Sequence, residues 1–117
     1  MTSTGLSRIA KPVGYYVSSP PIDRLIDKFG AYLEKTSAQQ KCLMAAALLD
    51  HMAAVGCDYY PIDSSLETVD PDGLLGAELR AVIVEIADAS DARELNFLVA
   101  AIVDQHTDDI RNGAYDA

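Results

Sequence analysis

The chain has 117 residues, with nine basic and eighteen acidic side chains, so its formal net charge is −9. This length suits a single domain that can bury a hydrophobic core without disulfides or metal ions. Half of the residues are hydrophobic, which excludes a disordered chain. The longest apolar run, residues 42–49, is too short to span a bilayer, and residues 1–10 lack the apolar core of a secretory signal. We expect a cytoplasmic protein that does not act on membranes.

The charge is divided unevenly along the chain. Residues 1–60 carry six basic and five acidic side chains, whereas residues 61–117 carry three basic and thirteen acidic ones. Phosphate groups require a positive surface, so the acidic half argues against nucleic-acid binding. The same acidic half would suit a partner protein with a basic surface.

The first 18 residues differ in composition from the rest. They are rich in Ser, Thr, Gly and Pro, and they contain two bases but no acid. The segment Val13–Val17 favours a β-strand but is too short to form a sheet alone. We therefore expect residues 1–18 to form an extended arm, with Tyr15 and Tyr16 packed on the helices or on a neighbouring chain.

Residues 19–113 show apolar side chains at helical spacing and are predicted to form an all-α domain. Ser19 caps the first helix, Ser37–Gln40 resembles a capping box, and Asp70-Pro71 and Ser90-Asp91 mark two further helix starts. The predicted helices cover about residues 20–35, 37–55, 71–88 and 91–111, and residues 114–117 form a tail. Residues 57–69 are expected to be the longest connection. The fold class predicted is a four-helix up-and-down bundle.

No catalytic constellation is present. The sequence contains no glycine-rich phosphate loop, no nucleophile elbow, no CxxC and no HExxH. Asp50 precedes His51 directly, and Asp104 lies two residues before His106, so neither pair shares a helix face as metal ligands would. We predict that the protein is not an enzyme and binds neither a metal nor a cofactor. The roles of both histidines and of Cys57 stay open.

The leading hypothesis is a small regulator, adaptor or inhibitor that works by binding another protein. Tyrosine is enriched at the centre of protein interfaces, and two acids in the last turn of the final helix are unfavourable for the helix itself. The predicted partner-binding residues are Tyr15, Tyr16, Tyr59, Tyr60, Asp108 and Asp109.

Two alternatives stay open. The helix at residues 42–49 is apolar on all sides and rich in alanine, so the bundle could hold an apolar small molecule or a pigment. The acidic second half could instead mimic nucleic acid toward a basic target. We expect a homodimer under all three hypotheses, because symmetry readily completes a partly covered bundle.

Overall fold

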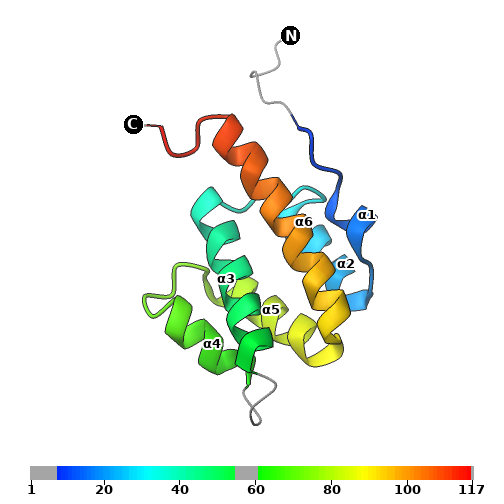
Figure 1. Ribbon diagram of the computed structural model, residues 1–117, viewed down its shortest axis with the longest axis vertical. Coiled ribbons are helices and arrows are strands. Elements are labelled where there is room, and N and C mark those ends of the chain that lie inside the picture. Colours follow the sequence, from blue (N-terminus) through cyan, green and yellow to red (C-terminus); the bar gives the residue numbers. More distant parts are fainter. Residues whose placement is uncertain (1–7, 55–60, 117) are drawn as a thin grey trace.

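The computed structural model describes residues 8–54 and 61–116, which form an all-α fold without strands (Figure 1). The all-α prediction is therefore confirmed for these ranges. Six helices rather than four are present in the described residues: α1 (Val13–Tyr16), α2 (Pro20–Phe29), α3 (Ala38–Ala54), α4 (Ile62–Val69), α5 (Ala77–Ala89) and α6 (Ala92–Arg111).

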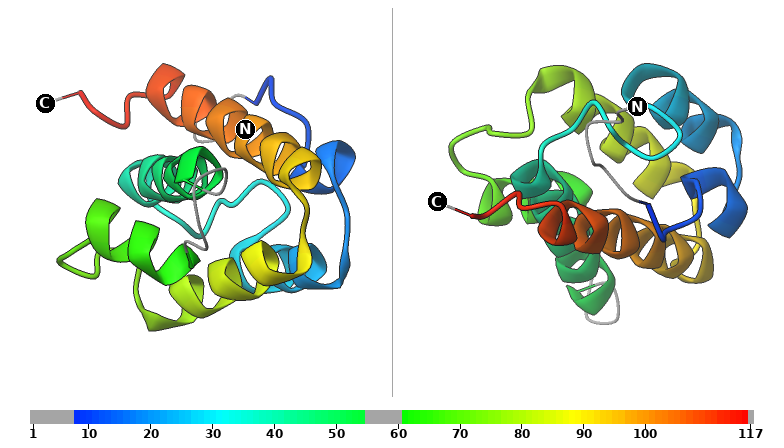
Figure 2. Two further views of the ribbon diagram at one scale, coloured as in Figure 1. Left: turned by 60° about the horizontal axis from the view of Figure 1, so that its bottom comes forward. Right: turned by 90° about the horizontal axis from the view of Figure 1, so that it is seen from above.

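The helices pack in two layers. α3 and α6 lie side by side, and α1 rests on α6 (Figures 1 and 2). α2, α4 and α5 form the layer beneath them, in which α5 contacts both α2 and α4. Leu48, Leu66, Ile83, Leu98 and Ile102 are buried in the core between the layers. An up-and-down bundle of four helices is not specifically shown, because α1 and α4 also take part in this packing.

The described part of the N-terminal arm belongs to the fold. Val13–Tyr16 forms one helical turn instead of the expected extended segment. Val13 is fully buried, and its N–H donates to the carbonyl of Ala31 at 2.8 Å. Tertiary packing of this valine thus overrides the local preference for an extended conformation.

The first predicted helix is too long. Ser19 caps α2 by accepting a hydrogen bond from the N–H of Ile22. The helix then ends at Phe29 instead of continuing to residue 35, because Gly30 adopts a φ of 98° that glycine tolerates and other residues rarely adopt.

Two helix starts follow their sequence signals closely. The hydroxyl of Ser37 accepts from the N–H of Gln40, and the Gln40 side chain accepts from the N–H of Ser37, so the predicted capping box precedes α3. Asp91 and Glu94 form the same reciprocal pair before α6. Both helices therefore begin within one residue of their predicted starts.

The predicted helix start at Asp70 is wrong. Asp70 instead follows α4, a helix that lies within the expected connection, and α5 begins only at Ala77. The buried Asp70 carboxylate accepts hydrogen bonds from the N–H groups of Leu74 and Leu75, at 2.8 and 2.9 Å. These bonds close the turn between α4 and α5, so the acid organises the loop after a helix and not the start of one.

Replacing Asp70 with alanine is expected to destabilise the protein by about 1–3 kcal/mol, because two backbone N–H groups lose a charged acceptor. Urea unfolding followed by circular dichroism measures the change. Asp72→Ala, which removes an exposed acid two residues away, is the control. Equal stability of the two variants would contradict this role for Asp70.

Candidate functional site

The C-terminal half of α6 contacts the N-terminal arm through Asp108. The Asp108 carboxylate is 3% exposed and accepts hydrogen bonds from the N–H groups of Ile9 and Ala10, at 3.1 and 3.0 Å. Arg111, one turn later, lies 3.2 Å away and forms an ion pair with it. Asp108 therefore holds the arm in place.

These contacts keep Asp108 ionised. Burial alone would raise the pKa of its carboxyl group, but the N–H groups of Ala10 and Ile9 and the guanidinium of Arg111 outweigh that effect. The net result is a pKa below the ordinary value. Ionised Asp108 is thus the form that the folded arm stabilises.

The neighbouring acid, Asp109, faces α3. Its carboxylate lies 2.7 Å from the ammonium group of Lys41, whose side chain is only 2% exposed. Lys41 also donates a hydrogen bond of 3.0 Å to the carbonyl of Thr36. An almost completely buried ammonium group requires such partners. Asp109 therefore contributes to the packing of α3 against α6.

Two further side chains of α6 hold the arm. The amide of Gln105 donates to the carbonyl of Lys11 at 2.6 Å, and the hydroxyl of Tyr16 donates to Asp104 at 2.6 Å. This hydrogen bond to Asp104, together with burial, raises the pKa of Tyr16 above its ordinary value. Three side chains of α6 thus fix the arm between residues 9 and 16.

The fixed arm displays apolar side chains to solvent. Ile9 is 71% exposed and Tyr15 is 72% exposed. The Tyr15 ring meets Tyr16 edge to face, with 5.8 Å between the ring centroids, and the ammonium of Lys11 lies 5.9 Å from its centroid. Tyr15 is therefore held by its neighbours and still open to a partner.

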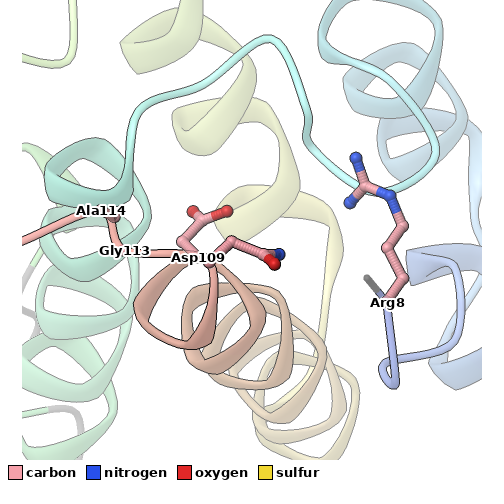
Figure 3. A pocket seen from close by; sticks show the side chains of 5 residues that line it. Arg8, Asp109, Gly113 and Ala114 are labelled. Atoms are coloured by element: carbon pink, nitrogen blue, oxygen red, sulfur yellow. The ribbon is translucent and has the colours of Figure 1, made fainter. Parts of the chain in front are cut away.

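A small cavity of about 190 Å³ opens beside Asp109 (Figure 3). Its lining includes Arg8, Asn112 and Gly113, and the Arg8 guanidinium lies 4.7 Å from the centroid of the Tyr32 ring. Sites for drug-sized ligands usually measure about 300–1,000 Å³ and are mainly apolar. This cavity is smaller and more polar than such a site.

Four of the six predicted site residues lie on the arm or near the end of α6, and two of them, Tyr16 and Asp108, make hydrogen bonds between the arm and the helix. Tyr15 and Tyr16 belong to the arm, and Asp108 and Asp109 to the helix that holds it. Both acids have partners within the chain, so their contact with another protein stays a prediction. Tyr59 and Tyr60 lie outside the described residues.

Sequence reasoning missed Lys41 and Gln105. Lys41 precedes the buried residues Met44 and Leu48 by one and two turns, so helical spacing already placed it on the inner face of α3. Gln105 follows Ile102 by three residues in the same way. The helical spacing of the buried apolar residues was the available signal, because both polar residues occupy positions in that pattern.

The two histidines lie apart from this junction. The Nε2 atom of His106 is 2.7 Å from the hydroxyl of Tyr115, and Nδ1 of the half-buried His51 has no hydrogen-bond partner in the described part of the chain. Across residues 8–54 and 61–116, no group of three or more His, Cys, Asp or Glu side chains could hold a metal ion.

Comparison of the chain with models of protein families, with curated proteins and with solved structures finds no match. None of the described helices is long and apolar enough to cross a membrane.

Asp109→Asn is expected to destabilise the protein by about 2 kcal/mol, because it leaves the buried Lys41 ammonium without its counter-charge. This loss of stability is smaller than that for a fully buried pair, since Asp109 is partly exposed. Adding Lys41→Met should restore much of the loss, as measured by urea unfolding. If the double variant is no more stable than Asp109→Asn alone, the buried charge is not the cause.

Asp108→Asn is expected to cost about 1–3 kcal/mol at pH 7. A lowered pKa stabilises the fold above the carboxyl group's ordinary value, about 3.8, and this contribution is lost as the pH falls through the folded-state pKa. The difference in the free energy of unfolding between the variant and the wild type should therefore shrink below about pH 4. Unfolding measured at both pH values, with exposed Asp88→Asn as control, checks this. A difference that persists at low pH would contradict the assignment.

Proposed function

We propose that this protein is a non-enzymatic interaction module that binds a partner protein along the edge formed by its arm and α6. The main support for this proposal is the location of the exposed apolar side chains. Eight large hydrophobic residues are exposed in the described parts of the chain, and three of these lie on the arm or on the side of α6 that holds it: Ile9, Tyr15 and Phe97. Such clustering is typical of interaction sites.

We call the outward side of this junction the arm edge and define it by Ile9, Tyr15 and Phe97. Phe97 precedes Asp104, the partner of Tyr16, by two helical turns and so shares that side of α6. Because α6 already holds the arm, binding would cost little conformational entropy at these side chains. A fixed aromatic ring surrounded by apolar groups is also typical of the residues that dominate binding energy.

Unpaired cations on the arm edge indicate the chemistry of the partner. Lys11 lies over the ring of Tyr15, and Arg93 lies 5.4 Å from the centroid of Phe97. Neither cation forms an ion pair with a described residue. A segment that combines apolar side chains with carboxylates would complement this edge. This differs from the basic partner expected from sequence, since Asp108 and Asp109 already have cationic partners.

The two alternative functions have less support. Met44, Ala45, Ala47 and Leu48 of α3 are all buried, so the alanine-rich helix is closely packed where an apolar ligand was considered. The acidic surface is partly neutralised, because Arg24 pairs with Glu85, Lys28 with Glu78, and Arg80 with Asp63. Such pairing makes the surface a poor imitation of an array of phosphates.

Affinity purification from the native organism tests the proposal. Tyr15→Ala is expected to reduce recovery of the partner roughly tenfold, the effect of losing about 1.4 kcal/mol of binding energy. Deletion of the arm is a poor test, since the buried Val13 belongs to the core. Leu74→Ala is the matched control, because Leu74 is an exposed residue that is distant from the arm in sequence and lies in the turn between α4 and α5.

Quantitative mass spectrometry of the co-purifying proteins provides the measurement. The proposal requires at least one protein that the wild type and Leu74→Ala both retain and Tyr15→Ala loses. An identical set of proteins for all three baits would contradict it. Circular dichroism of each bait establishes that the fold is intact.

A further inference from the structure

A hollow of about 170 Å³ lies between the arm and the second half of α6, and we call it the arm hollow. It is lined by Ile9 and Ala10 of the arm and by Asp104, Thr107, Asp108 and Arg111 of the helix. Figure 1 shows the arm running beside this half of α6. Ile9 also belongs to the arm edge, and Asp104 holds Tyr16, the neighbour of Tyr15. The arm hollow therefore continues the arm edge toward the end of α6.

The charges around the arm hollow do not balance. Asp108 and Arg111 form an ion pair at 3.2 Å, so they compensate each other. The exposed Asp104 forms no ion pair with a described residue, and its hydrogen-bond partner there is the neutral hydroxyl of Tyr16. A carboxylate has about four lone-pair positions, of which this hydroxyl occupies one. Asp104 thus offers the hollow an uncompensated negative charge with free acceptor positions.

The walls of the arm hollow suit the stem of a long side chain. Ile9 and Ala10 are apolar, and the hydroxyl of Thr107 already donates to the carbonyl of Val103 in its own helix. Lysine packs its methylene stem along such surfaces while its ammonium group meets a charge or water. An apolar cavity of about 150 Å³ holds a benzene molecule. The lysine side chain has fewer non-hydrogen atoms than benzene and the arginine side chain has more, so the volume favours lysine.

We propose that the arm hollow receives a lysine side chain of the partner protein, whose ammonium group binds Asp104. This inference rests on the proposed function, because the lysine belongs to the segment that binds the arm edge. The net charge of −9 favours the approach of a basic group.

The lysine would give the bound segment a direction. Carboxylates of the partner are expected opposite Lys11 and Arg93, and Arg93 lies at the start of α6, whereas the arm hollow lies near its end. A segment with its carboxylates and its lysine in this order matches the charges along the helix, and the reversed segment places like charges together. Such juxtaposition of like charges is how interfaces exclude a wrong register.

Selection of random dodecapeptides displayed on phage, with the full chain immobilised, tests the inference. Peptides that bind the wild type but not Tyr15→Ala are ligands of the arm edge, and we expect them to share a lysine at one fixed position. Asp104→Asn keeps an oxygen that can accept from Tyr16 but removes the charge. A lysine-bearing peptide should bind this variant about tenfold more weakly than the wild type, the lower end of the coupling between close charges at interfaces. Asp88→Asn, which removes an exposed acid of α5 and leaves the same net charge, is the matched control and should bind like the wild type.

Replacing the peptide's lysine with norleucine, which keeps the stem but not the charge, completes a double-mutant cycle. This change should weaken binding to the wild type about tenfold and leave binding to Asp104→Asn nearly unaltered. Arm-edge peptides without a fixed lysine, or equal losses of affinity in both proteins, would overturn the inference and leave the proposed function intact. Selection of no peptide that depends on Tyr15 would contradict the proposed function itself, and this inference with it.

Discussion

Two adjacent carboxylates near the end of α6 connect three parts of this fold. Successive helical residues point about 100° apart, so Asp108 meets the arm while Asp109 meets Lys41 of α3. Negative charge is unfavourable at a helix C-terminus. Here the backbone N–H groups of the arm, the guanidinium of Arg111 and a buried ammonium offset that cost. Both acids are tolerated at this helix end because they have partners far away in sequence.

This arrangement makes α6 the organising element of the surface as well as of the core. Its inner face packs on α3, and one flank holds the arm, so Ile9 and Tyr15 are displayed at fixed positions. Val103 and Ile110 are exposed farther round the same helix.

Local signals predicted much of the fold, and long-range contacts explain the failures. Ser37 and Asp91 each form a capping box with the residue three positions later. The starts of α3 and α6 were therefore predicted from the sequence. The sequence at Asp70 also resembles a helix start. Its carboxylate instead accepts two hydrogen bonds that close a turn, and the packing of α4 and α5 favours this turn over a helix start. Lys41 could not be paired with Asp109 from sequence, because their contact spans 68 positions. The junction residues were partly predicted, but their partners within the chain were not.

The bond between Ile9 and Asp108 spans 99 positions, which has a consequence for biosynthesis. A ribosome makes the arm early, but its anchoring carboxylate exists only after α6 has been translated. Until then Val13 has no complete site to enter, and the nascent chain must keep this segment soluble while the other helices form. Contacts of such long range slow folding, since the connecting loop must close first. Insertion of the arm should thus follow the formation of α6 and be among the last steps in the folding of this domain.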